Sequence, residues 1–235
     1  MAVALSITQI YLKIVYAFVF HGYVEIVYFN LSTQLEYACN ITSPQGFWGK
    51  DEYPNPRKDV NYCGRNCTKS WVCDPAGILT SHQADDLDRT LDRIATSGNC
   101  RCTQCTSNEG HYIYVALMSR MKISEGQTKE MEAYAFSEHL KEKWMGGTCG
   151  NIVVIVVSTE DKQMPTNPGS EASAILTLEC IKLIYNEVKP LVKTRGYYSA
   201  LKSMIRRYKY SLKTLTFIPL GECHCWWTRS PRGHM

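Results

Sequence analysis

Cysteine is the residue type most able to do chemistry in this chain, which carries 11 of them among 235 residues. Thiols in such numbers pair as disulfides in an oxidising compartment or bind a metal ion. A structural zinc site would combine Cys63 and Cys67 with Cys102 and Cys105, because C-x3-C and C-x2-C pairs suit tetrahedral zinc. The full set is Cys39, Cys63, Cys67, Cys73, Cys100, Cys102, Cys105, Cys149, Cys180, Cys223 and Cys225.

Disulfides are the better interpretation of these cysteines. Cys73 and Cys100 crowd the region of the zinc pairs, and the sequence also carries export signals, described below. The connectivity is not fixed by the sequence. Because the count is odd, at least one cysteine stays unpaired or bonds to another chain, and Cys223 and Cys225 are the first candidates. The disulfide candidates are Cys63, Cys67, Cys73, Cys100, Cys102, Cys105, Cys149 and Cys180.

Three carboxylates follow segments that read as strands. Asp74 stands before Pro75, and Glu160 and Asp161 follow the most apolar segment of the chain. Ligands of open α/β sheets bind beyond the carboxyl ends of strands, so Asp74, Glu160 and Asp161 are candidate ligands for a hard cation such as calcium. The alternative, which we favour, is that they cap turns or face solvent. No other cofactor is expected.

No complete catalytic set accompanies these residues. A G-x-S-x-G nucleophile elbow and an H-E-x-x-H zinc motif are both absent from the sequence. Cys225 is followed by Arg229 four residues later, a spacing that does not suit a cysteine phosphatase. The chain is therefore expected not to be an enzyme. A formal net charge of only +4 also argues against nucleic acid as a partner.

The N-terminal region indicates export. Residues 14–20 are an uninterrupted apolar run, which suits a secretory signal better than a membrane span. Segment 1–29 is therefore predicted to be a signal peptide or a signal anchor. N-x-S/T sequons follow at Asn30, Asn40 and Asn66, of which Asn40 and Asn66 are the glycosylation candidates. We expect a secreted or cell-surface protein with its domain on the extracellular side.

Helical and strand patterns alternate through the middle of the chain. Thr80 and Gln83 fit a capping box that begins a helix. The continuous apolar run 152–157 is typical of a strand buried on both faces. The remaining periodicity predicts a strand over 112–118 and helices over 128–144, 171–189 and 197–210.

This order predicts an α/β fold, with a small central sheet in a layered α/β/α arrangement stabilised by disulfides. The domain is expected over 60–210. It is preceded by an irregular lead-in over 30–59 that contains cysteine and proline, and it is followed by an irregular tail over 211–235. With 45% hydrophobic and 20% charged residues, the composition is ordinary for a folded domain.

The ordered motifs of residues 60–208 resemble the TPM domain, a family named for a thylakoid lumen protein, a photosystem II repair protein and the modulator of the levamisole receptor. The resemblance rests on CGRNC at 63–67, WVCDPAGIL at 71–79, CGN at 149–151, STED at 158–161 and GYY at 196–198. The cysteine-rich form is most similar to the nematode group of levamisole-receptor modulators.

The resemblance implies an extracellular auxiliary protein that modulates a levamisole-sensitive acetylcholine-gated receptor by binding its extracellular part. Acetylcholine-receptor subunits are the partners that it implies. Two alternatives stay open: a secretory-pathway phosphatase of TPM type that uses the carboxylates, and a secreted disulfide-rich binding protein. Membrane association is a further possibility, because the basic segment 202–213 suits anionic headgroups as well as a solvated helix face.

Overall fold

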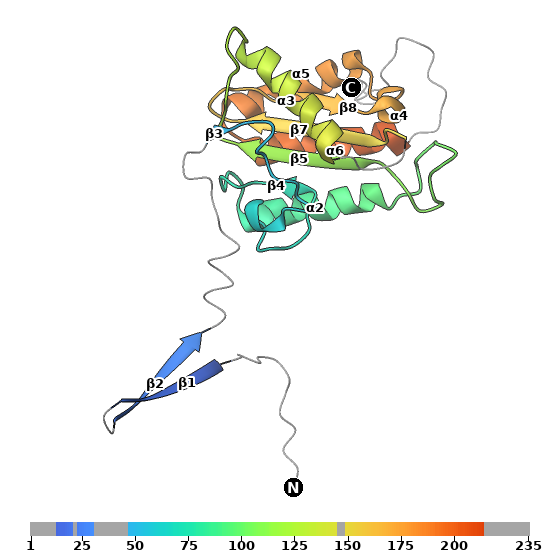
Figure 1. Ribbon diagram of the computed structural model, residues 1–235. Helices are drawn as coiled ribbons and strands as arrows, with labels where there is room; N and C mark the ends of the chain where they lie inside the picture. Colours follow the sequence, from blue (N-terminus) through green and yellow to red (C-terminus); the bar gives the residue numbers. More distant parts are fainter. Residues whose placement is uncertain (1–12, 21–22, 31–46, 145–148, 214–235) are drawn as a thin grey trace, which may run out of the picture.

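A four-stranded sheet forms the centre of the folded domain (Figure 1). The computed structural model describes residues 13–20, 23–30, 47–144 and 149–213, and the domain occupies the last two ranges. The strand order is β4-β5-β7-β8, with the first three parallel and β8 antiparallel. The strands are β4 Val72–Cys73, β5 Tyr112–Met118, β7 Ile152–Ser158 and β8 Thr166–Pro168.

The two central strands are continuous apolar runs because both of their faces are covered. β5 and β7 pair in register from Tyr112↔Ile152 to Met118↔Ser158. Every residue of β7 is buried, and so is every residue of β5 after Tyr112. The two strands predicted from the apolar runs are confirmed.

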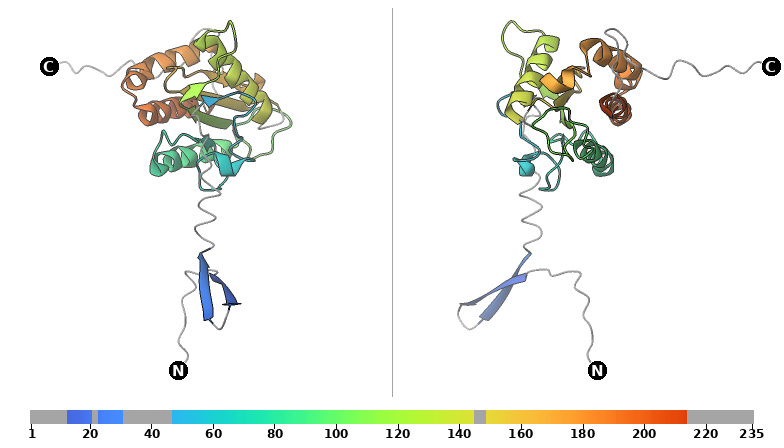
Figure 2. Two further views of the ribbon diagram at one scale, coloured as in Figure 1. Left: turned by 60° about the vertical axis from the view of Figure 1, so that its left-hand side comes forward. Right: turned by 90° about the vertical axis from the view of Figure 1, so that its right-hand side faces the viewer.

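Helices cover both faces of this sheet (Figure 2). On one face, α3 (Lys129–Trp144) packs against β7 and β8. On the other face, α2 (Ser81–Ala95) and α6 (Tyr197–Lys213) pack together, and α5 (Leu178–Lys193) packs against α6. The layered α/β/α fold is therefore as predicted. The capping box that begins α2 is also confirmed, because Thr80 and Gln83 exchange side-chain to backbone hydrogen bonds.

The helix expected over 171–189 is wrong in its bounds. The chain forms a short α4 (Ser170–Ser173), then turns and begins α5 at Leu178. Thr177 caps α5, since its hydroxyl accepts a hydrogen bond from the Cys180 N–H. Leu178, the first residue of α5, is exposed. Pro190 lies inside α5 and does not end it.

The folded domain also begins earlier than residue 60. Strand β3 (Phe47–Trp48) pairs in parallel with β6 (Arg120–Met121). Tyr53 is fully buried, and its hydroxyl donates to the carbonyls of Cys73 (3.0 Å) and Leu117 (2.7 Å). Residues 47–59, which were expected to be an irregular lead-in, are thus part of the folded domain, and Trp48 and Tyr53 lie in its core. A short 3-10 turn, Val60–Tyr62, follows them.

The N-terminal region contains two further strands. β1 (Lys13–Phe20) and β2 (Tyr23–Asn30) pair as an antiparallel hairpin within the segment expected to be a signal or anchor. Within the part of the chain that the structure describes, no helix combines the length and apolar composition that crossing a membrane requires. Export and anchoring stay predictions. The cysteines at 39, 223 and 225 lie outside the described residues, as does most of the expected tail.

Candidate binding cleft

A cleft of about 1190 Å³ opens at the carboxyl edge of the parallel strands. It is lined by the loop that follows β7, residues 159–162, and by Arg120 and Met121 of β6. The last turns of α5, with Arg195 and Tyr197 after them, and Lys129 of α3 also contribute to the lining. The position agrees with the expectation that a ligand of this fold binds beyond the carboxyl ends of the strands.

The lining of the cleft is predominantly cationic. Six of its side chains are basic and two are acidic: Arg120, Lys129, Lys162, Lys189, Lys193 and Arg195 against Glu160 and Asp161. Arg120 forms an ion pair with Glu160, and Lys129 with Asp161 at 3.1 Å. The other four basic side chains of the lining are not part of these two ion pairs.

The remaining cations face the cleft without carboxylate partners among the described residues. Lys162, Lys189, Lys193 and Arg195 are all exposed, and none of them takes part in an ion pair there. Lys189 and Lys193 stand four residues apart on α5, which places them on the same side of the helix. The cleft therefore presents four uncompensated positive charges to a ligand.

Asp161 is a structural carboxylate in this cleft. Its Oδ2 accepts hydrogen bonds from the Met121 N–H (2.9 Å) and the Ser158 hydroxyl (2.7 Å), and its Oδ1 faces Lys129. Burial raises the pKa of Asp161, but these hydrogen bonds and the Lys129 charge outweigh it, so the pKa lies below its usual value. Asp161 thereby ties the loop after β7 to the last residue of β6.

Asp74 is held away from the other two carboxylates by its own turn. It is buried, and its oxygens accept the N–H groups of Ile78 (2.9 Å) and Leu79 (2.7 Å). Burial raises its pKa, and the backbone hydrogen bonds reduce that rise without cancelling it. Asp74 does not line the cleft, and it forms no cation-binding group with Glu160 and Asp161 among the described residues. The geometry favours the turn-capping interpretation over the calcium site.

The backbone holds one cleft cation in a conformation that usually belongs to glycine. Arg195 has φ of 61° and follows the end of α5. Its N–H bonds to the Val192 carbonyl (3.0 Å), and the Gly196 N–H bonds to the Leu191 carbonyl (2.8 Å). These two bonds define a Schellman helix end, in which the left-handed position is most often glycine. Lys162 also has a left-handed φ, of 57°.

Apolar groups complete the cleft. Phe47 and Ile123 line it while remaining 39% and 38% exposed, and the Arg120 guanidinium lies 5.2 Å from the centre of the Phe47 ring. Exposed aromatic and aliphatic side chains beside arginine are typical of protein-binding surfaces. The cleft thus combines positive charge with apolar contact area.

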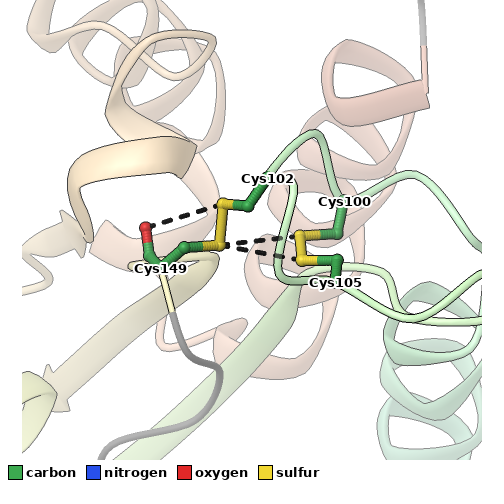
Figure 3. Close-up of side chains that lie close together, drawn as sticks. All are labelled: Cys100, Cys102, Cys105 and Cys149. Carbon is green, nitrogen blue, oxygen red and sulfur yellow. Dashed lines mark hydrogen bonds between the residues drawn. A yellow bond between two sulfur atoms is a disulfide. The ribbon is translucent and has the colours of Figure 1, made fainter.

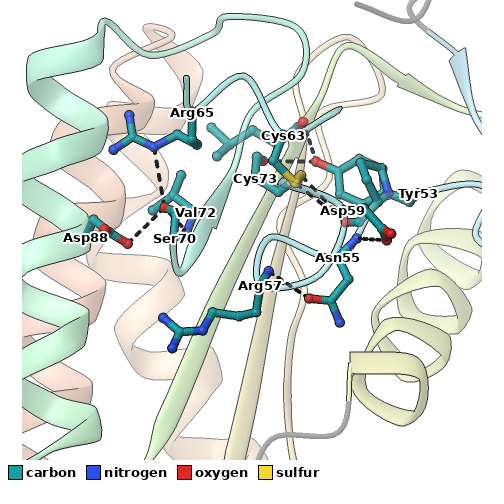
Figure 4. The surroundings of a disulfide bond; sticks show 12 residues. Tyr53, Asn55, Arg57, Asp59, Cys63, Arg65, Ser70, Val72, Cys73 and Asp88 are labelled. Atoms are coloured by element: carbon teal, nitrogen blue, oxygen red, sulfur yellow. Dashed lines mark hydrogen bonds between the residues drawn. A yellow bond between two sulfur atoms is a disulfide. The ribbon is translucent and has the colours of Figure 1, made fainter. Parts of the chain in front are cut away.

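One disulfide lies directly behind this edge of the sheet. Cys63 and Cys73 are bonded with their Cα atoms 4.4 Å apart, beside the buried Tyr53 (Figure 4). The loop between the two cysteines is anchored to α2, because the Ser70 hydroxyl donates to Asp88 Oδ1 at 2.9 Å. The bond therefore fixes the end of β4 against the segment that precedes it.

Two more disulfides form a separate group at the opposite, amino-terminal edge of β5 and β7. Cys100 is bonded to Cys105, and Cys102 to Cys149 (Figure 3). Cys67 and Cys180 are disulfide-bonded as well. The four cysteines of the zinc alternative are not brought together: Cys63 is bonded to Cys73, whereas Cys102 and Cys105 lie with Cys100 and Cys149.

The glycosylation candidates fall in different parts of the chain. Asn66 is exposed in the loop between Cys63 and Cys73. Asn40 lies outside the described residues. The exposure of Asn66 is compatible with a glycan, and use of both sequons stays a prediction.

The cations of the cleft were not singled out from the sequence. The basic segment 202–213 drew attention instead, yet Lys202 of that segment pairs with Asp86 and Arg207 pairs with Glu187. The sequence contained two features that could have indicated the positive charge of the cleft. Lys189 and Lys193 have i,i+4 spacing, and an arginine precedes Gly196 just after the helix pattern ends.

Three solved structures are similar to this chain, and one of them shares its fold. The N-terminal domain of a protein from P. gingivalis matches with a TM-score of 0.53 at 16% identity, over 71% of this chain and 92% of that one. The BA42 protein of the psychrophilic bacterium Bizionia argentinensis matches with a TM-score of 0.43 at 15% identity, over 57% and 81% of the two chains. The N-terminal domain of a Corynebacterium glutamicum protein matches with a TM-score of 0.43 at 12% identity, over 66% of this chain and 90% of that one. At this identity, the first of these likenesses establishes the fold alone.

The fold and motifs define the class of this protein as a TPM-like α/β domain. Residues 48–162 match the family described as Modulator of levamisole receptor-1, so this part of the chain is similar to that family. By its description the family is one of modulators and not of catalysts, as expected for this chain. No curated protein matches the chain.

Proposed function

We propose that this protein is an extracellular auxiliary protein that modulates a levamisole-sensitive acetylcholine receptor by binding the receptor's extracellular part with the cationic cleft. The match of residues 48–162 to the family of levamisole-receptor modulators supports the class of function. The observation that carries the proposed contact is the group of four uncompensated cations around the cleft, Lys162, Lys189, Lys193 and Arg195.

This geometry selects an acidic protein surface as the partner. Exposed charges of one sign steer association with a surface of the opposite sign and determine its orientation. Phe47 and Ile123 supply apolar area in the same cleft, which free ions would leave unused. An acidic loop that carries an apolar side chain satisfies both features.

Modulation requires more than binding. A bound protein shifts a gating equilibrium only by the difference between its affinities for the open and closed states. We therefore place the acidic loop on a part of the receptor that moves during gating, so that the cleft meets it better in one state.

The test is co-expression of the full chain with a levamisole-sensitive receptor in oocytes, recording agonist-evoked current and the surface level of both proteins. Lys189→Glu is the test variant. Lys182→Glu is the matched control, because Lys182 is exposed on the same helix but does not line the cleft. Both variants reverse one exposed charge on α5.

We expect the wild-type chain and Lys182→Glu to change the current at constant receptor surface level, and Lys189→Glu to change it less. The difference should shrink as ionic strength rises, since salt screens exposed charges over about 10 Å at 0.1 M. An equal effect of the two variants would refute the cleft as the contact. No change of current with wild-type protein at the surface would refute modulation of that receptor and favour a secreted binding protein.

A further inference from the structure

Four cysteines gather at the amino-terminal edge of the central strands, away from the cleft. Cys100, Cys102 and Cys105 come from the loop between α2 and β5, and Cys149 comes from the turn that leads into β7 (Figure 3). All four Sγ atoms lie within 4.8 Å of one another. This is the only such group of possible metal ligands found among the described residues.

The distances between sulfurs of different disulfides match a metal geometry. Cys149 Sγ lies 3.8 Å from Cys100 Sγ and 3.7 Å from Cys105 Sγ. A tetrahedral zinc ion with Zn–S bonds of about 2.3 Å holds its sulfurs about 3.8 Å apart. Once reduction has broken the two S–S bonds, small movements of the side chains are therefore sufficient for the four sulfurs to surround one ion.

The backbone brings these cysteines together by contacts other than the disulfides. The Cys105 N–H bonds to the Cys102 carbonyl (3.1 Å), a turn that places both side chains on one side of the loop. The loop is anchored at its end because the Gly110 N–H bonds to the Ala95 carbonyl at 2.8 Å. Gly150, with φ of 78°, allows the sharp turn directly after Cys149.

Neighbouring side chains hold the same loop against the start of β7. Asn151 donates to the Gly110 carbonyl at 2.7 Å, and Glu171 Oε1 accepts the Arg101 N–H at 3.2 Å. These bonds do not involve sulfur, so reduction of the disulfides does not itself break them. The four thiols then remain neighbours, which is the condition for a preformed metal site.

We propose that Cys100, Cys102, Cys105 and Cys149 form a tetrahedral four-thiolate zinc site when reduced, as an alternative to their two disulfides. Four thiolates in tetrahedral geometry select zinc among the abundant divalent ions. All four side chains are only partly buried, so an ion and a reductant both have access. The site is distinct from the cleft and does not depend on the proposed receptor function.

The exchange between the two states is balanced as follows. Each disulfide accepts two electrons and two protons from a dithiol reductant, which is itself oxidised to a disulfide, and two thiols result. One zinc ion then binds the four sulfurs and displaces four protons to solvent. Zinc and the disulfides exclude each other, because each sulfur is either bonded to sulfur or available to the metal.

The test uses the full chain, reduced with a dithiol in metal-free buffer and then freed of excess reductant without air. Zinc is added and its stoichiometry is measured, and cobalt(II) replaces it in a parallel sample. Alkylation followed by peptide mass mapping reports which thiols the metal protects. The oxidised chain is treated identically.

We expect one zinc per reduced chain, the visible d–d bands of tetrahedral cobalt with thiolate charge transfer, and protection of the four cysteines. The oxidised chain should bind none. Cys105→Ser should weaken zinc binding at least tenfold, whereas the paired control Cys63→Ser/Cys73→Ser should retain it. Both variants are compared with wild type by far-ultraviolet circular dichroism.

Two results would overturn the proposal: no zinc binding by the reduced wild-type chain, or protection of cysteines other than these four. The alkylation map of the wild-type chain decides the matter even when a variant fails to fold. Because no readout involves a receptor, failure here is separate from failure of the proposed modulation.

Discussion

Replacing Arg195 by glycine should stabilise the domain while weakening its cleft. Arg195 occupies the left-handed position of the helix end after α5, with φ of 61°. This conformation costs a residue that bears a Cβ about 1–2 kcal/mol relative to the right-handed region. Glycine avoids the penalty, but it loses about 0.5–1 kcal/mol through the greater freedom of the unfolded chain.

The midpoints of these two ranges leave a net gain for Arg195→Gly of about 0.5–1 kcal/mol. Arg195 is exposed and forms no ion pair among the described residues, so no salt bridge is lost to offset it. For a folded unit of this size, 1 kcal/mol corresponds to about 2–4 °C in Tm. We expect Tm to rise by about 1–4 °C, measured by thermal unfolding with the disulfides intact.

Arg195→Ala separates the two contributions of this residue. Alanine keeps the Cβ and hence the strain, but it removes the charge as glycine does. Alanine should leave Tm within about 1 °C of wild type, and both variants should reduce the modulation of the receptor current equally. Equal stabilisation by alanine and glycine would refute the strain argument. A full wild-type current effect with both variants would exclude Arg195 from the contact.

Two further predictions concern the packing behind the cleft. The low pKa of Asp161 contributes stability that is present above its unfolded pKa of about 3.9 and is lost as pH falls through the folded pKa. In Asp161→Asn, Tm should therefore fall less steeply than in wild type between about pH 4 and pH 2, as followed by thermal unfolding; parallel curves would contradict this. Tyr53→Phe leaves the buried carbonyls of Cys73 and Leu117 without their donor and should cost about 1–3 kcal/mol in urea unfolding, whereas no loss would show that these hydrogen bonds are not needed.

The strength of each local signal decided which elements could be predicted. The runs 112–118 and 152–157 are buried on both faces, so their composition alone identified them as strands. The capping box at Thr80 fixed the start of α2 because both of its bonds are local. The break between α4 and α5 was missed, since the apolar pattern continues through it and only the Thr177 cap marks the new start.

Residues 47–59 show the other limit of prediction. The residues around Tyr53 show no helical or strand periodicity of apolar side chains. The place of Tyr53 in the core depends on hydrogen bonds to Cys73 and Leu117, which lie 20 and 64 residues away in the sequence. Such a position follows from tertiary structure and not from local propensity. The same holds for the grouping of Cys149 with the cysteines of residues 100–105.

The cleft lies at the strand edge where the sequence offered candidate ligands for a cation. Those carboxylates were weighed as cation ligands because ligands of such sheets bind beyond the carboxyl ends of strands, although turn capping was the favoured interpretation. Folding brings Arg120 and Lys129 onto Glu160 and Asp161 from segments about 30–40 residues away, and these pairs consume the negative charge. The cations that remain come from the loop after β7, from α5 and from the turn after α5. The sign of this site is thus decided by which charges find partners, and the acidic ligand that we propose would bind at the edge where a cation was one alternative of the sequence.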